Sequence, residues 1–171
     1  MAVLEVLKYP SPVLNNKALP VKEVDSKLKG LINDMAETMY ALSAVGLAAP
    51  QVGKLLQVAV IDVTPKEEGK NLIVLINPRI VAKEGEIFLE EGCLSIPGYR
   101  EKVKRWARVK VEAMDEHGEK REIEGEGLLS IALQHETDHL DGMLIIDRIS
   151  SLKRNIFKKN MKKQLLAKEQ G

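Results

Sequence analysis

The sequence is poor in cysteine, in net charge and in long apolar runs. Cys93 is the single cysteine among the 171 residues, which excludes an internal disulfide framework. No apolar run approaches the ~20 residues that a membrane-spanning helix needs, so we expect no membrane partner. Residues 1–5 lack the basic start and apolar core of a signal peptide. We therefore expect a cytoplasmic protein, or an organelle protein whose leader has been removed.

The net charge is only +1 at pH 7, which gives no sign of a protein that coats nucleic acid, and we expect no DNA partner. The charge is unevenly distributed along the chain. Residues 151–171 hold seven basic residues and one acidic residue, so the other 150 residues carry a net charge of −5. An acidic body with a basic tail predicts a polyanionic partner for the tail.

The length and composition match one soluble globular domain, which we expect to span residues 1–171. Residues 26–43 place apolar side chains at helical spacing, and Asp25 is a suitable N-cap for this N-terminal helix. The helical period returns over residues 127–140. The basic residues 151–171 are expected to form a C-terminal helix.

Between the helices, apolar or alternating runs bounded by polar turns indicate β-strands. The expected strands are residues 55–63, 72–76, 80–89, 108–114 and 121–124. Polar residues 64–70 connect the first two strands, and a turn at residues 115–118 joins the last two. We expect residues 45–53, which contain Gly and Pro, to form a loop and residues 144–146 to be extended. The fold class is therefore α+β, with a mainly antiparallel sheet around a central helix.

The most specific local pattern is HETDH at residues 135–139. Positions i and i+4 share one face of a helix, so the imidazoles of His135 and His139 can bind one metal ion. Glu136 lies within reach of a water on such an ion. Two of the three histidines of the chain fall in this pentapeptide, which favours a metal site over a solvated helix turn.

A catalytic metal site needs a third protein ligand and an open position for water. Ile145 occupies the place where metzincin peptidases have their third histidine, which excludes a third ligand of the metzincin type. His117 lies in the expected hairpin turn, where a solvated role is favoured. Cys93, in a Gly- and Pro-containing loop after a strand, is the better candidate. A thiolate with two imidazoles suits zinc or ferrous iron.

Three segments together resemble the peptide deformylases, enzymes that remove the formyl group from nascent N-formylmethionine chains. The segments are VGLAAPQ at residues 45–51, EGCLS at 91–95 and QHETDHLDG at 134–142. Each motif alone is moderate evidence, whereas all three in this order are highly specific. Ala44 departs from the family pattern, because it occupies the position of the first glycine, and only glycine adopts positive φ freely.

The resemblance implies the roles of the reacting groups. Cys93, His135 and His139 would bind the metal, and Glu136 would be the general acid and base. The oxyanion would accept hydrogen bonds from the side-chain amide of Gln51 and the backbone N–H of Leu94. Family members use ferrous iron natively, and zinc, nickel or cobalt can occupy the site.

The resemblance also implies how a formylmethionyl peptide binds. The backbone of Gly46 would align the substrate as an added strand, and Arg100 would meet a more distal carbonyl of the substrate. The methionine pocket would be lined by Val45, Leu89, Leu128, Ile131 and Ala132. Leucine and isoleucine on a helix face are core residues by default, so these pocket assignments depend on the resemblance.

The basic tail allows two interpretations. An apolar stripe runs along the expected helix, because Phe157, Met161 and Leu165 are four residues apart. In one interpretation the helix docks on the body and its lysine face is solvated. In the other, the tail attaches the protein to the ribosome near the tunnel exit. The second is what the resemblance to family members with a similar C-terminal helix implies, and both interpretations stay open.

Three other functions stay open beside a bacterial deformylase. An endopeptidase with an HExxH motif would need a third ligand other than Cys93. A ribosome-binding protein with a structural metal would need a fourth protein ligand, and the sequence offers no evident candidate. A degenerate, inactive deformylase is disfavoured because Glu136, Gln51 and Cys93 are all present.

Overall fold

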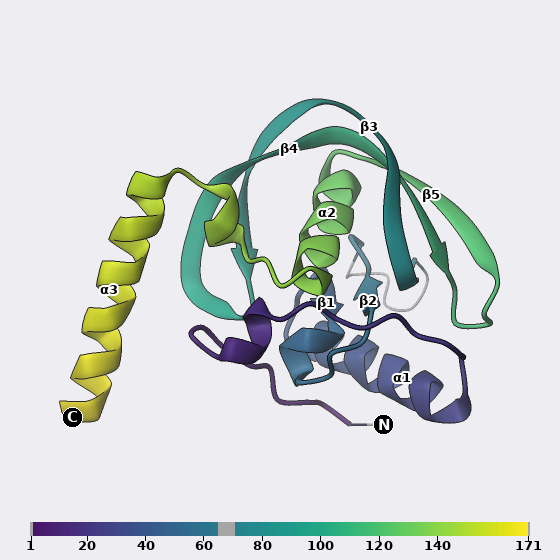
Figure 1. Cartoon of the computed structure of the whole chain (residues 1–171), viewed down its shortest axis with the longest axis horizontal. Helices are drawn as coiled ribbons and strands as arrows, with labels where there is room; N and C mark the ends of the chain where they lie inside the picture. Colours follow the sequence, from purple (N-terminus) through teal and green to yellow (C-terminus); the bar gives the residue numbers. More distant parts are fainter. Residues whose placement is uncertain (1, 65–70, 171) are drawn as a thin grey trace.

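The computed structural model describes residues 2–64 and 71–170, with the side chains of 169 and 170 left out. One antiparallel sheet holds the strands in the order of the sequence. The strands are β1 Gly46–Ala48, β2 Val58–Ile61, β3 Ile73–Cys93, β4 Ile96–Met114 and β5 Lys120–Glu126. The long, curved β3, β4 and β5 arch over the central helix α2 Leu128–Leu140 (Figure 1). The expected class, an antiparallel sheet with helices, is confirmed.

Two other helices flank this core. α1 Ser26–Ala41 begins where expected, because the Asp25 carboxylate accepts a hydrogen bond from the Leu28 N–H at 2.8 Å. α3 Ser151–Gln170 extends away from the sheet at the edge of the molecule (Figure 1). None of the helices in the described part of the chain is both long and apolar enough to cross a membrane.

The largest departure from the expected strands is β3. The sequence predicted two separate strands, 72–76 and 80–89. Asn77 does adopt a positive φ of 52°, but the ladder with β4 only shifts register between Ile76 and Arg79 and then continues. β4 likewise begins at Ile96 rather than at residue 108, so Cys93 ends a strand and does not lie in a loop.

Two further segments differ from expectation. Residues 45–53 contain β1 and a 3-10 helix, Ala49–Val52, and not only a loop. Residues 144–146 were expected to be extended, but the 3-10 helix Ile145–Arg148 forms there and buries Ile145 and Ile146. The polar connection expected at 64–70 lies, from residue 65 onward, outside the described residues.

Three apolar clusters hold the elements together. The first packs α1 against β1 and β2 through residues such as Met35, Met39 and Leu47. The second packs α2 against the sheet, where Leu133 is fully buried. The third fixes the start of α3, because the Phe157 ring packs between Tyr9 and Tyr99, with ring centroids 5.2 and 4.7 Å away. α2 is therefore held against the sheet, and other side chains of the same helix line a cavity.

Candidate metal centre and active-site pocket

α2 is fixed against the sheet immediately before its first histidine. The Gln134 side chain accepts a hydrogen bond from the Trp106 N–H and donates one to the Trp106 carbonyl, both at 2.9 Å. A Cβ atom on Gly125 of β5 would lie 2.7 Å from Leu133, so the absence of a side chain there lets the helix pack closely. These contacts set the direction in which His135 points.

Three ligand-type side chains converge at this helix. His135 and His139 lie one turn apart, with 3.1 Å between their Nε2 atoms. Cys93, at the end of β3, places its Sγ 3.3 Å from the Nε2 of His139. One donor atom from each residue lies within 4.8 Å of the others. One thiolate and two imidazoles at this separation fit a single zinc or ferrous ion and leave a coordination position open.

The thiol of Cys93 is suited to act as a ligand. Burial alone would raise its pKa, but the positive charge of His139 and hydrogen bonds to His135 and His139 outweigh burial and hold the pKa well below its usual value. Because the thiolate is the form that binds metal, the site favours the reactive state of Cys93.

His135 is oriented by a carboxylate. Its Nδ1 lies 3.0 Å from Oε1 of Glu91, so Nδ1–H donates and the Nε2 lone pair faces Cys93 and His139. Arg105 holds Glu91 with two hydrogen bonds, at 2.8 and 2.9 Å. The sequence assigned no role to either residue. Glu91 lies inside a recognised motif, whereas Arg105 sits in a run of charged residues that resembles a solvated face.

Glu136 is buried next to the three ligand-type residues. Its Oε1 has no hydrogen-bond partner among the described residues. Burial raises the pKa of this carboxyl above its usual value, although the neighbouring histidines oppose the shift. A buried carboxylate oxygen without a partner requires a polar group from outside the chain, such as a water or a substrate.

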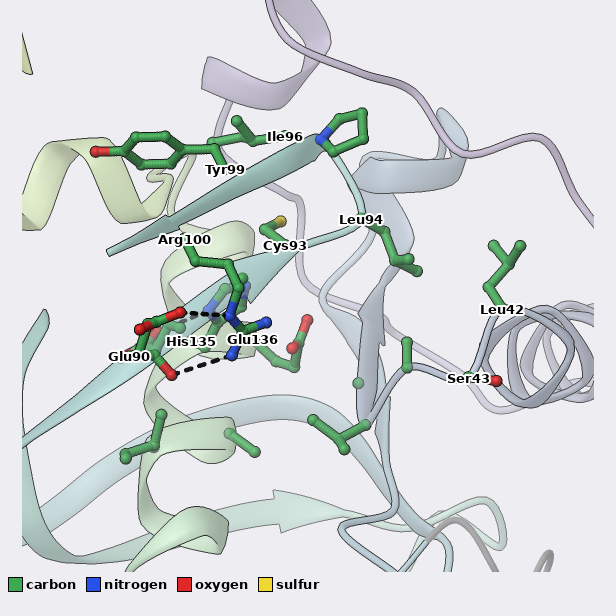
Figure 2. Close-up of a pocket in the computed structure, with 18 of the residues that line it drawn as sticks. Leu42, Ser43, Glu90, Cys93, Leu94, Ile96, Tyr99, Arg100, His135 and Glu136 are labelled. Atoms are coloured by element: carbon green, nitrogen blue, oxygen red, sulfur yellow. Dashed lines mark hydrogen bonds and ion pairs between the residues drawn. The ribbon is translucent and has the colours of Figure 1, made fainter. Parts of the chain in front are cut away.

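The site opens into a cavity of about 570 Å³. Twelve of the thirteen residues that the sequence analysis assigned to the site line this cavity. They are Val45, Gly46, Gln51, Leu89, Cys93, Leu94, Arg100, Leu128, Ile131, Ala132, His135 and Glu136. His139 is the exception, since it is buried behind His135 and Cys93. The rim also includes residues that the sequence did not indicate, among them Leu42, Ser43 and Tyr99 (Figure 2).

Gln51 is held rigidly beside Cys93. Its Oε1 accepts a hydrogen bond from the Ala48 N–H at 2.9 Å, which fixes the orientation of the amide. Its Nε2 donates to Ser95 Oγ at 3.1 Å and lies 3.6 Å from Cys93 Sγ. The amide nitrogen of Gln51 therefore lies beside the Cys93 sulfur and can donate into the cavity.

The polar mouth of the cavity is formed by Arg100. Its Nε donates to Glu90 Oε1 at 2.8 Å, and both side chains are exposed. Figure 2 shows Arg100 turned toward Glu90 beside the cavity. The apolar walls include Leu89 and Leu128, which are large exposed apolar side chains. The cavity thus combines an apolar wall, an exposed cation and a ligand cluster at its base.

Ala44 does not adopt the conformation that its motif position placed in doubt. The residues with positive φ near this point are Ser43, at 54°, and Gly53, at 82°. The alanine therefore causes no backbone strain of the kind expected.

Comparisons with known proteins agree on one family. Residues 3–155 match the family model of polypeptide deformylase. The peptide deformylase of Thermodesulfovibrio yellowstonii is 54% identical over 162 residues, which cover 95% of this chain and 98% of that protein. The peptide deformylase of Syntrophobacter fumaroxidans is 51% identical over 165 residues, covering 96% and 97%.

Solved structures give the same result. A peptide deformylase from Legionella pneumophila superposes with a TM-score of 0.88 at 45% identity, covering 96% of this chain and 98% of that one. A peptide deformylase from Ehrlichia chaffeensis in complex with actinonin superposes with a TM-score of 0.88 at 36% identity, with the same coverage.

Proposed function

The chain belongs to the peptide deformylase family of metal-dependent hydrolases, which remove the N-formyl group from newly made proteins, and on this premise we propose how its residues perform the reaction. Cys93, His135 and His139 bind one divalent metal ion. The distances between their donor atoms and the low pKa of Cys93 support this ligand set. We further propose ferrous iron as the native metal, with zinc, nickel or cobalt able to replace it.

A divalent ion held by Cys93, His135 and His139 would supply Lewis-acid chemistry toward a water and the formyl group. Glu136 moves the proton. Its free Oε1 accepts a proton from the attacking water, whose oxygen forms a bond to the formyl carbon. The C–N bond then breaks, and Glu136 gives the proton to the departing amine. The raised pKa of Glu136 suits both steps, since the carboxyl must take up and release a proton near neutral pH.

Negative charge develops on the formyl oxygen as the water attacks. The Nε2 of Gln51 and the backbone N–H of Leu94 donate hydrogen bonds to it. Gln51 is preorganised for this role because Ala48 and Ser95 already hold its amide. A fixed donor needs no reorganisation at the moment of reaction, which is why such groups contribute strongly.

The peptide binds along β1. Among the residues that the structure describes, this strand pairs with β2 alone and stands at the edge of the sheet, so the backbone of Gly46 is available to an added strand. The methionine side chain of the substrate packs in the cavity against the wall formed by Val45, Leu89, Leu128, Ile131 and Ala132. Arg100 meets a carbonyl further along the substrate.

The observation that carries this proposal is the convergence of Cys93, His135 and the free oxygen of Glu136 in one cavity. The test is formate release from formyl-Met-Ala by protein prepared without oxygen, with acetyl-Met-Ala as the control. We expect formate from the first peptide and no cleavage of the second. Metal-loaded protein that releases no formate would contradict the catalytic assignment.

A second experiment, which measures the metal content of a Cys93 variant, separates this ligand set from that of an endopeptidase. Cys93→Ala protein should fail to hold one divalent ion per chain. If it binds the metal as tightly as the parent protein, the third ligand lies elsewhere, and the endopeptidase alternative then becomes the stronger one.

For α3 we propose contact with the ribosome near the tunnel exit, in the bacterial cytoplasm. The helix docks through Phe157 and Met161, while Lys158, Lys159, Lys162 and Lys163 are exposed. Phosphate binding by such lysines weakens steeply with salt. Replacing the four lysines by glutamate should abolish ribosome co-sedimentation, and unchanged, salt-insensitive binding would count against the proposal.

A further inference from the structure

A chain of charged contacts runs from His135 to the 3-10 helix Ile145–Arg148 that follows α2. His135 Nδ1 lies within hydrogen-bond distance of Glu91, and Glu91 accepts hydrogen bonds from Nε and Nη2 of Arg105. The other side of the same guanidinium donates to Asp138 Oδ2 at 2.6 Å. Arg148, in the 3-10 helix after α2, completes the chain with bonds to both Asp138 oxygens, at 2.8 and 3.1 Å.

The burial of these groups makes their charge balance important. The side chains of Arg105, Glu91 and Asp138 are 3%, 5% and 9% exposed, whereas that of Arg148 is 44% exposed. The three buried groups alone comprise two carboxylates and one guanidinium, an excess of one negative charge. Arg148 supplies the balancing positive charge from the surface. When a buried carboxylate loses one of its cationic partners, its charge is left less compensated, and it interacts more strongly with the partners that remain.

The remaining partner of Asp138 would be Arg105, which is also the support of Glu91. Without Arg148, Asp138 competes more strongly for the Arg105 guanidinium, and the two bonds that orient Glu91 weaken. Glu91 in turn fixes the proton on Nδ1 of His135 and the direction of its Nε2. Carboxylates that hold a ligating histidine in this way tune metal affinity.

We infer that Arg148 is a positioning residue for His135, acting through Asp138, Arg105 and Glu91. The inference rests on the proposed role of His135 as a metal ligand. It places a determinant of metal retention in the segment between α2 and α3, outside the cavity that holds the substrate site.

A second cavity makes this inference testable. It has a volume of about 410 Å³ and is lined by Arg105, Asp138 and Arg148, together with Gln134 and Trp106. Removal of the Arg148 side chain therefore leaves a solvent-accessible space next to Asp138. A guanidinium ion has the same planar donor geometry as the missing group and can bind a carboxylate there.

The experiment measures the rate at which the cobalt-loaded protein releases its metal to a chelator, followed by the visible absorption of the ion. Arg148→Met should release cobalt about 10-fold faster than the parent protein, the lower end of the range for outer partners of a ligand. Arg148→Lys should fall between the two, because one ammonium replaces a two-pronged contact. Millimolar guanidinium, but not sodium chloride of equal ionic strength, should slow release from Arg148→Met and leave the parent protein unchanged.

Arg121→Met is the matched control. Arg121 also bonds two carboxylates, Asp115 and Glu119, but lies exposed on the β4–β5 hairpin. Its loss should leave cobalt release unchanged. Release from Arg148→Met within two-fold of the parent rate, or an equal acceleration in Arg121→Met, would overturn the inference.

A third variant separates this inference from the proposed ligand set. His135→Ala should lose cobalt outright. If it retains the metal as the parent does, the ligand assignment itself is wrong. If it loses the metal while Arg148→Met behaves as the parent, only the role of Arg148 is wrong.

Discussion

A Cβ atom on Gly46 would lie 2.5 Å from Oε2 of Glu136, so the edge strand β1 and the proposed general base are in direct contact. The glycine therefore does more than expose a backbone edge. It leaves the space that the carboxylate of Glu136 occupies, and it does so at the strand to which we expect the substrate to bind.

Gly46→Ala should fold but lose activity. The clash is with the end of a flexible side chain, so Glu136 can move aside at little cost to stability, but it then no longer faces the substrate. We expect kcat/KM for formyl-Met-Ala to fall about 100-fold, the scale of a lost general base.

Gly30→Ala is the control, since nothing lies within 4 Å of its added methyl group. That variant should be fully active and about 0.5 to 1 kcal/mol more stable, because alanine is the better helix former. Full activity in Gly46→Ala would show that Glu136 does not need this position.

Phe157→Ala should loosen α3. The buried ring is held between Tyr9 and Tyr99, and removal of a buried phenylalanine costs about 3 kcal/mol. Chemical denaturation should report a loss of that size, and limited proteolysis should cut within α3. Ile156→Ala, one residue earlier and exposed, should change the unfolding free energy by less than about 0.5 kcal/mol. Equal effects of the two substitutions would mean that α3 is not docked through Phe157.

Local patterns predicted the elements that carry the chemistry. The helical period over residues 127–140 predicted α2, and Gly142, with a φ of 75°, follows the end of this helix, where a left-handed glycine is typical. The alternation of Val109, Val111 and Ala113 placed all three on the buried face of the sheet, and the hairpin to β5 pairs as expected. These features are set by neighbours in sequence.

Features that depend on distant contacts were not predictable in the same way. Asn77 and Pro78 resemble a turn, yet the long partner strand β4 keeps the ladder intact past them. Arg105 is buried between Glu91 and Asp138, two residues from different elements, so the charged sequence around it could not reveal its inward position. Only the folded arrangement shows that His135 has a support of this kind.

The β4–β5 turn should contribute stability that depends on pH. A hydrogen bond from Arg121, together with the backbone N–H groups of Glu119 and His117, lowers the pKa of Asp115 from 3.8 to about 2. A carboxyl group whose pKa is lower in the folded than in the unfolded state stabilises the fold at pH values above its unfolded pKa. This stabilisation is lost as the pH falls through the folded-state pKa. Asp115→Asn should therefore be less stable than the parent above about pH 4, and the difference should vanish between about pH 4 and pH 2.

The measurement is urea denaturation of both proteins across this pH range. Both carry the same metal centre, so its loss in acid cancels in the difference. A stability gap that stays constant down to pH 2 would rule out the charge of Asp115 as its cause.

Gln51→Ala should slow the reaction without loosening the metal. The amide is proposed to meet the oxyanion, and removal of one such donor costs about 10²- to 10³-fold in kcat. KM and metal content should change little. Ser95→Ala removes only a group that holds the Gln51 amide, at 3.1 Å, while Ala48 still fixes its other end. We expect the kcat of Ser95→Ala to fall about 10-fold or less, which is well below the loss expected when the donor itself is removed. A larger loss in Ser95→Ala than in Gln51→Ala would transfer the donor role to the serine.

Glu136→Gln tests whether the carboxylate is needed for proton transfer or only fills the space beneath Gly46. The amide has the same shape, so the clash-free packing against β1 is kept, but it cannot accept and return a proton. We expect kcat to fall about 10²- to 10⁴-fold while the protein still binds one metal ion, because Glu136 is not among the proposed ligands. Metal content by elemental analysis and formate release must be measured on the same sample. Loss of the metal together with activity would make Glu136 part of the coordination site. Full activity would remove it from the mechanism, and the water would then have to give its proton to another group.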